Sequence, residues 1–421
     1  MIDVVLGLQW GDEGKGKIVD VLTPKYNVVA RFQGGPNAGH TLEFNGQKHV
    51  LNTIPSGIFH PECINIIGNG VVIDPVTLKK EIEKIKASNA EPEKNLYISQ
   101  KAHLILPTHR LVDAASEANK GDHKIGSTLR GISPTYQDKI GRSGLRIGDI
   151  LTKNFKAKYD SAVVNHKNLL DRLNYKYDLS EHEPAFFEAI EFLKKFQIVN
   201  SEYFVQQLMS SGKKILAEGA QGTLLDIDFG SYPFVTSSNT ITGGVCTGLG
   251  VSPQKIKKVF GVFKAYSTRV GSGPFPTEQN NETGEKLRKL GFEFGATTGR
   301  PRRTGWLDLP TLKYSLMLDG VTDLICTKSD VMSGFEEVLV CDEYEIEGKR
   351  TKEIPFNFTD AEIIPRYKKF AGWKENISSI KNYNDLPETF RTYMNYVSSE
   401  IGLKVNTISV GPDREQTVFV G

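Results

Sequence analysis

The sequence has little of what marks secreted, zinc-binding or membrane-spanning proteins. Only four of its 421 residues are cysteines, none in a CxxC spacing, so we expect reduced thiols rather than a disulfide framework. None of the eight histidines forms an HxxxH pair, which argues against a zinc site built by the protein. No apolar run approaches the roughly 18–20 residues of a membrane-spanning helix.

The chain also lacks a dominant charge. It carries 52 Lys and Arg against 50 Asp and Glu, a net charge of +2, so no overall field attracts nucleic acid or an anionic membrane. The start, MIDVVLGLQ, has neither the basic region nor the cleavage site of a signal peptide. We therefore expect a cytoplasmic globular protein with no nucleic-acid and no membrane partner.

Short, nearly continuous apolar segments alternate with helical patterns, which is typical of a parallel sheet covered on both faces. The predicted strands are Val4–Leu8, Val28–Phe32, Ile64–Ile67, Leu104–Leu106, Ile215–Ala217, Val259–Ala265, Leu324–Thr327, Val338–Tyr344 and Val405–Ile408. The predicted helices are Pro75–Ser88, Glu183–Lys195, Leu386–Ile401 and, after Gly305, the stretch up to residue 319. With no linker, repeat or low-complexity segment, we predict an α/β, P-loop NTPase-like single domain over residues 1–421, with elaborating subdomains.

A glycine-rich segment follows the first predicted strand. Residues 11–17 read GDEGKGK, the G-x4-G-K frame of a phosphate-binding loop. Backbone N–H groups there could converge on phosphate oxygens, with a helix expected from about Lys15 and with Lys15 and Lys17 to pair with the charge. Ile18 stands where such loops carry a metal-binding Ser or Thr, and Asp12 lies inside the loop, able to hold the metal or act as a base. The alternative is a Gly-rich turn with solvated lysines.

The tetrapeptide TKSD, residues 327–330, ends another predicted strand. The Asp330 carboxylate could accept both N–H groups of guanine while the Lys328 stem covers the base. Adenine offers no such donor pair and would leave a charge unpaired. The loop Ser409–Pro412 could form the second wall of this pocket. An exposed polar turn is the alternative.

Three arginines fall within four residues of GATTGRPRR, residues 295–303, after two threonines. Guanidinium groups bind carboxylates and phosphates, so we predict a site for a small dianion. A basic surface turn or a nucleic-acid patch is the alternative, and the absence of interleaved aromatics disfavours nucleic acid.

Other polar loops also follow strand-like runs. In GGPNAGHT, residues 34–41, His40 could donate to a phosphate or serve as an acid, although a lone histidine is more often structural. Gln221 in EGAQG and Thr236 in VTSSNT could contact a phosphate or a base edge, or belong to ordinary polar loops.

Taken together and in this order, QWGDEGKGK, GGPNAGHT, EGAQGTLLDIDFGSYPFVTSSN, TTGRPRR and TKSD resemble the adenylosuccinate synthetase family, from Ile2 to about Arg414. The resemblance implies a GTP-dependent ligase that joins IMP and L-aspartate through 6-phosphoryl-IMP and releases GDP and phosphate. This is the first committed step of AMP biosynthesis from IMP. It also implies one Mg²⁺ per subunit, GTP as co-substrate and a homodimer.

The resemblance also implies roles for individual residues. Asp12 would be the general base and a Mg²⁺ ligand, the Gly39 carbonyl the other protein ligand, and His40 the general acid; Lys15 and Gln221 complete the catalytic set. Arg142 would reach the IMP phosphate of the neighbouring subunit. The implied IMP-binding residues are Asp12, Glu13, Gly14, Lys15, Asn37, Ala38, Gly39, His40, Thr128, Arg142, Gln221, Thr236 and Arg300.

The implied aspartate-binding residues are Ala296, Thr297, Thr298, Gly299, Arg300, Pro301 and Arg302. The implied GTP-binding residues are Gly11, Asp12, Glu13, Gly14, Lys15, Gly16, Lys17, Gly39, His40, Thr41, Arg302, Lys328, Ser329, Asp330, Ser409, Val410 and Gly411. Ser329 and Val410 stand where the family more often has Leu and Thr.

Two other functions stay open on the residues alone. A regulatory GTPase would also place a phosphate loop, a DxxG (Asp138–Gly141) and TKSD in this order. Against it, the metal-binding Ser or Thr is missing and this DxxG follows no apolar strand. The other alternative is a nucleotide-dependent ligase with a different acceptor.

Overall fold

The fold was obtained as a computed structural model, which describes residues 1–121, 124–295 and 299–420. Its centre is a ten-stranded sheet in the order β20-β19-β15-β11-β1-β10-β2-β5-β7-β9. Every neighbouring pair is parallel except β19 and β20. In sheet order the strands are Thr417–Phe419, Val405–Ser409, Asp323–Thr327, Ile256–Lys264, Ile2–Gly7, Ile215–Glu218, Val28–Arg31, Ile64–Ile67, Leu96–Ser99 and Gln197–Val199.

Helices cover both faces because alternate strand residues are apolar on each side. On one face Val5 and Val29 pack against Ile18 and Val19 of α1 (Lys15–Leu22). On the other face Val4 and its neighbours pack against α8 (Ser201–Ser210) and α9 (Gly243–Leu249). The predicted α/β architecture, with a mostly parallel sheet between helices, is confirmed.

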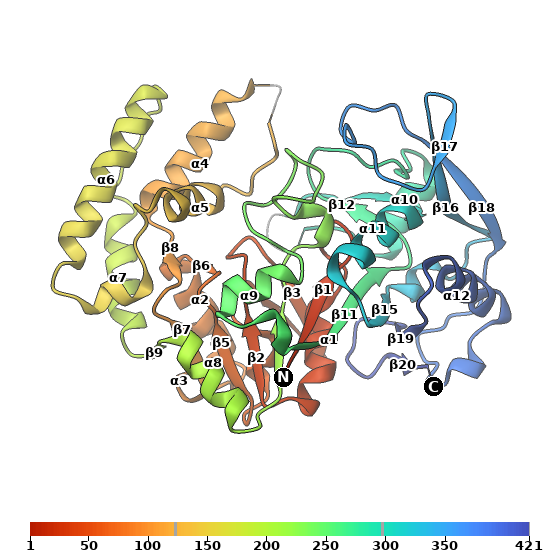
Figure 1. The fold of residues 1–421 in the computed structure, drawn as a ribbon, viewed down its shortest axis with the longest axis horizontal. Helices are drawn as coiled ribbons and strands as arrows, with labels where there is room; N and C mark the ends of the chain where they lie inside the picture. The colour runs from red at the N-terminus through yellow and green to blue at the C-terminus, as the bar shows by residue number, and fades with distance from the viewer. Residues whose placement is uncertain (122–123, 296–298, 421) are drawn as a thin grey trace.

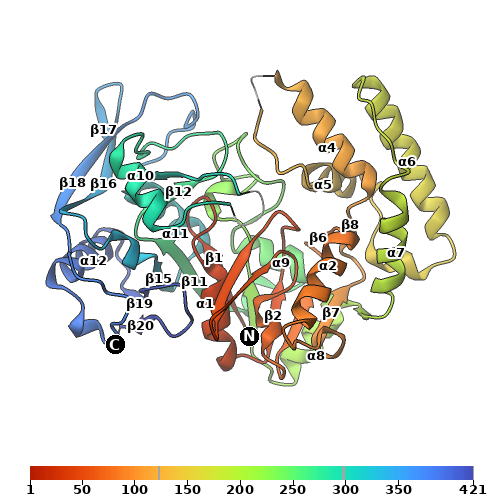
Figure 2. The same cartoon turned by 180° about the vertical axis from the view of Figure 1, so that it is seen from behind.

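Additional elements extend the two ends of the sheet (Figures 1 and 2). Next to β5, β7 and β9 lies a mainly helical part: α2 (Pro75–Lys86), α3 (Pro92–Asn95), α4 (Pro107–Asn119), α5 (Ile132–Gly141), α6 (Phe155–Arg172) and α7 (Glu183–Leu193). At the opposite end, α11 (Leu309–Asp319) and α12 (Glu388–Ile401) pack near a four-stranded sheet of β14 (Leu307–Asp308), β16 (Glu337–Ile346), β17 (Lys349–Thr351) and β18 (Ile364–Ala371).

Smaller elements border the central strands. They are the pairs β3 (His40–Phe44) with β4 (Gln47–Leu51), β6 (Val72–Ile73) with β8 (His103–Leu104) and β12 (Ser267–Arg269) with β13 (Arg303–Gly305), and the helix α10 (Glu282–Leu290).

Some predicted elements differ from the structure. The run at 338–344 lies in β16, which pairs antiparallel with β18 outside the central sheet. The run at 104–106 contributes only to the short β8. The helix expected soon after Gly305 begins at Leu309, because Asp308 caps it by accepting the N–H of Thr311. The sequence pattern also missed β7, β9 and β20, which are short.

The expectation of reduced thiols is confirmed, since all four cysteines are free: Cys63, Cys246, Cys326 and Cys341. Among the described residues, no helix combines the length and the apolar character needed to cross a membrane. The DxxG considered for a GTPase switch lies inside α5, and not in a loop after a strand.

Candidate active site

The predicted segments meet at the carboxyl-terminal edge of the central sheet. The phosphate loop follows β1, and the segments with His40 and Gln221 follow β2 and β10. The guanine loop follows β15, and the Ser409 loop follows β19. Because these strands are parallel, their ends lie at one edge, where ligands bind in open α/β sheets.

The phosphate loop is held in shape from within by Glu13. The buried Glu13 carboxylate accepts hydrogen bonds from the backbone N–H groups of Gln9 (3.0 Å) and Gly11 (2.9 Å) and from Lys15 Nζ. The Glu13 carbonyl accepts from Thr327 Oγ1 at 2.5 Å, which ties the phosphate loop to the guanine loop. Glu13 therefore shapes the loop, and its side chain points into protein.

The two lysines of the loop have different surroundings. Lys17 Nζ donates to Ser409 Oγ (2.7 Å), Gly411 O (2.6 Å) and Gln416 O (2.9 Å), which uses all three hydrogens of an ammonium group. Burial lowers the pKa of Lys17 to about 7, against the opposing effect of nearby carboxylates. Lys17 thus joins α1 to the Ser409 loop, while Lys15 is the lysine with donors left for a ligand phosphate.

Asp12 adopts a left-handed backbone conformation (φ 61°) and keeps its side chain 30% exposed at the site. Its Oδ2 lies 2.7 Å from Arg302 Nε. Arg302 Nη1 in turn donates to Glu293 Oε2 at 2.6 Å. The carboxylate of the phosphate loop therefore faces the arginine loop directly.

His40 lies behind the start of α1. Its Nδ1 is 2.5 Å from Glu218 Oε1, and the same carboxylate accepts from the N–H and the hydroxyl of Ser56. A Cβ added to Gly16 would come within 2.8 Å of His40 Cβ, so only glycine permits this approach. Burial, together with Arg31, lowers the pKa of His40 against the opposing effect of Glu218.

Several predicted ligand residues carry buried polar atoms that have no hydrogen-bond partner among the described residues. They include Asn37 Oδ1, both amide atoms of Gln221 and Asp330 Oδ1. Gln221 has a φ of 57°, and its amide lies beside Gly34. Since most buried polar groups are hydrogen-bonded, these atoms on the predicted ligand residues are available to bond a ligand.

Other residues predicted to bind IMP or aspartate are half-buried or exposed. Thr128 and Thr236 are half-buried in loops, and Arg300 is exposed. Arg142 is exposed at the end of α5 with a φ of 63°, on the helical part of the molecule. Ala296, Thr297 and Thr298 lie outside the described residues.

A cluster of possible metal ligands occurs away from this edge, on α4, α5 and α6. His109, Asp138 and His166 place one ligand atom each within 4.8 Å of one another. Both histidine Nε2 atoms lie 3.0 Å from Asp138 Oδ2, while the N–H of Leu106 donates to His109 Nδ1 at 2.9 Å. His109 therefore keeps its proton on Nε2 and donates it to Asp138, whereas a metal-bound histidine donates from its other nitrogen. We assign the cluster to hydrogen bonding between helices.

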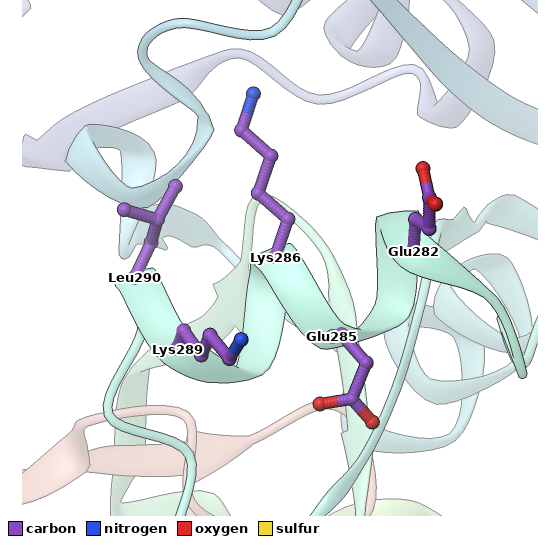
Figure 3. Close-up of a pocket in the computed structure, with 5 residues that line it drawn as sticks. All are labelled: Glu282, Glu285, Lys286, Lys289 and Leu290. Carbon is purple, nitrogen blue, oxygen red and sulfur yellow. The ribbon is translucent and has the colours of Figure 1, made fainter.

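A surface hollow on α10 does not form a second site. Its lining side chains extend from the helix in different directions and do not converge (Figure 3). They are Glu282, Glu285, Lys286, Lys289 and Leu290.

Sequence reasoning missed residues that support the site from beneath. Lys264, Tyr266 and Glu293 are buried behind Arg302. None of them stands in a recognisable motif, and only the position of Glu293 just before the arginine loop gave a signal.

The fold and this edge define a nucleotide-binding enzyme of the P-loop-like α/β class. The family model described as adenylosuccinate synthetase matches residues 4–418. Adenylosuccinate synthetase from Bacteroides fragilis is 58% identical over 418 residues, covering 99% of this chain and 98% of the relative. The Flavobacterium johnsoniae enzyme is 57% identical over 419 residues, or 99% of each chain.

Two solved structures have similar folds. The fully ligated adenylosuccinate synthetase from Plasmodium falciparum has a TM-score of 0.93 and 39% identity, covering 100% of this chain and 99% of that one. Cyanophage S-2L succinoaminodeoxyadenylate synthetase, solved with dGMP and dATP, has a TM-score of 0.64 over 99% of this chain and 95% of that one. At 19% identity it supports the fold alone.

The chain belongs to the adenylosuccinate synthetase family. It is a GTP-dependent ligase that joins IMP and L-aspartate in AMP biosynthesis.

Proposed function

We propose that the carboxyl-terminal edge of the central sheet carries out this ligation with Asp12 as the general base. The observation that carries the proposal is a partly exposed carboxylate inside a preformed phosphate loop, 2.7 Å from the arginine of the predicted dianion loop. In this proposal the base stands between the triphosphate and the acceptor purine. General bases contribute typically ~10²–10⁴-fold to rate.

The reaction proceeds in two steps. Asp12 removes the N1 proton of IMP, and O6 becomes nucleophilic and attacks the γ-phosphorus of GTP. The bond to the β–γ bridging oxygen breaks, giving 6-phosphoryl-IMP and GDP. Loop N–H groups, Lys15 and His40 stabilise the charge that spreads over the phosphoryl oxygens.

In the second step the amine of aspartate attacks C6. The C6–O6 bond breaks, phosphate leaves with O6, and the amine gives up its proton. Arg302, with Arg300, holds the aspartate carboxylates. Gln221, Asn37, Thr128 and Thr236 hold IMP, an assignment supported by the unpartnered amide atoms of Gln221 and Asn37.

Asp12 and Gly39 suit a Mg²⁺ ion, because both offer the oxygen ligands that this ion prefers. The segment that contains Gly39 lies against the phosphate loop, since His40 touches Gly16. One Mg²⁺ per subunit, when bound, neutralises phosphate charge.

Base recognition rests on Asp330 and Lys328, with the loop of Ser409, Val410 and Gly411 as the opposite wall. The unpartnered Asp330 Oδ1 is the acceptor expected for a guanine N–H. Lys17 supports this wall through its bonds to Ser409 and Gly411.

We also propose a cytoplasmic homodimer in which Arg142 crosses to the partner's IMP phosphate. Arg142 lines a surface hollow of about 600 Å³ formed by the segment after α5 and by α6. Ile140, two residues before Arg142, is 78% exposed, and Val164 on α6 is 56% exposed. Exposed apolar side chains on the two helices that flank Arg142 support a self-association surface there.

Phosphate release from GTP, measured with and without IMP plus aspartate, tests the proposal. We expect release only when both acceptors are present, with adenylosuccinate formed in equal amount. Phosphate release without IMP and aspartate would indicate a GTPase switch. Phosphate release that depends on a different acceptor would indicate a different ligase.

A further inference from the structure

The group that holds Arg302 in place is Glu293. The two residues face each other at the base of the arginine loop, where the N–H of Arg302 donates to the Glu293 carbonyl at 2.9 Å. Their side chains meet as well, through the 2.6 Å bond from Arg302 Nη1 to Glu293 Oε2. Backbone and side chain therefore fix the same pair twice.

Glu293 is itself fixed from behind. Its carboxylate is fully buried and lies 3.0 Å from Lys264 Nζ, which is also fully buried. Tyr266 Oη donates to Glu293 Oε1, and Lys264 Nζ also donates to Thr268 Oγ1 at 2.7 Å. With these bonds made, the Glu293 carboxylate has little freedom to turn.

Four charged side chains contact one another in the order Lys264, Glu293, Arg302 and Asp12. Their charges alternate and balance, with two cations and two anions. Although burial opposes ionisation, Lys264 and Arg302 lower the pKa of Glu293 to about 2. Burial lowers the pKa of Lys264 to about 8, with Glu293 opposing the shift. Both groups are therefore charged at neutral pH.

A buried ion pair of this kind is a weak contributor to stability. Replacing such a pair by apolar side chains is often neutral or stabilising, whereas removing one partner is costly. The position of the Glu293–Lys264 pair, directly behind an arginine that reaches the general base, suggests a role in orientation instead.

We infer that Glu293 is a positioning residue for aspartate binding. Its carboxylate holds the Arg302 guanidinium on the Asp12 side of the site, while Lys264 neutralises the charge of Glu293 from the buried side. This inference rests on the proposed role of Arg302 toward aspartate. Glu293 is fully buried behind Arg302 and bonds only protein groups in the structure. Its contribution is to hold Arg302 in the orientation that a carboxylate needs, so that this orientation is not lost before aspartate arrives.

The test compares Glu293→Gln, Lys264→Met and the double variant by aspartate KM, IMP KM, kcat and Tm. Glu293→Gln should raise the aspartate KM about tenfold, the loss expected for one charged hydrogen bond, with little change in IMP KM. Glu293→Asp, which keeps the charge, should recover part of the affinity. The double variant removes both buried charges and should regain Tm while its aspartate KM stays high.

Asp308→Asn is the matched control, because Asp308 is 1% exposed and hydrogen-bonded to Tyr344 and Thr311 rather than to Arg302. It should lower Tm with aspartate KM unchanged. The inference is overturned if the double variant regains normal aspartate KM together with Tm, or if Glu293→Gln leaves aspartate KM unchanged. Arg302→Leu distinguishes a failure of this inference from a failure of the proposed function. An unchanged aspartate KM in that variant would refute the proposed function itself.

Discussion

The Asp12 carboxylate and the Arg302 guanidinium lie 2.7 Å apart, between Oδ2 and Nε. The phosphate loop and the arginine loop thus touch through the residues proposed as general base and aspartate ligand. Arg302 Nε, although buried, makes this contact without hydrogen-bond geometry to any described residue. The contact is therefore an ion pair that a substrate carboxylate could take over from Asp12.

Replacement of Arg302 tests that exchange. Arg302→Leu should raise the aspartate KM by about tenfold to a hundredfold, the range for losing hydrogen bonds between charged groups, while IMP KM changes little. Initial rates of adenylosuccinate formation at varied aspartate give the constants. A normal aspartate KM would remove Arg302 from the aspartate site.

Asp330 should set the choice of base. Asp330→Asn replaces two acceptors by one acceptor and one donor, which matches the N–H and the 2-oxo group of xanthine and mismatches guanine. We expect GTP to weaken and XTP to become a substrate, measured as kcat/KM for GTP, XTP and ATP side by side. Unaltered preference for GTP would show that TKSD does not read the base.

Glu218 should raise the pKa of His40. Because the carboxylate opposes the burial that lowers the pKa of His40, Glu218→Gln should lower that pKa further. The imidazolium form would then be rarer at neutral pH, and the fall of kcat with rising pH should move to lower pH. A kcat profile identical to that of the unaltered enzyme would contradict a proton-donating His40.

The His109–Asp138–His166 cluster predicts an acid-sensitive fold. Burial, with His166 beside it, lowers the pKa of His109 to about 4, below the ordinary value of about 6.5. The unfolded chain therefore binds more protons between these values, so the free energy of unfolding should decrease as pH falls from 6.5 to 4. A charged His109 would set its Nδ1–H against the Leu106 N–H.

Urea unfolding at a series of pH values measures this effect. His109→Gln should flatten the decline, while the same change at the exposed His182 should leave it as steep as before. Equal slopes in the unaltered protein and in His109→Gln would place the acid sensitivity elsewhere.

Much of the fold could be read from the sequence because buried parallel strands are nearly continuous apolar runs. The phosphate loop and TKSD could be predicted as ligand-binding loops because each directly follows such a strand. β16 was misplaced because an apolar run does not reveal which sheet it joins. β7 was missed because Tyr97 and Ser99 interrupt its pattern.

Contacts between distant segments could not be predicted in the same way. Glu293 and Lys264 are 29 residues apart, and His109, Asp138 and His166 stand on different helices. Neither spacing nor periodicity specifies such pairs, which arise only when the elements pack. Lys17 is a similar case: its motif predicted phosphate binding, but its bonds to the Ser409 loop could not be predicted from the motif.

The most direct test of the central claim follows the oxygen at C6 of IMP. With IMP labelled by ¹⁸O at that position, the account predicts that the label appears in the released phosphate. Asp12→Asn should slow this transfer by roughly 10²-fold or more while GTP still binds. Label found in water, or an Asp12→Asn enzyme that transfers it at the normal rate, would contradict the account.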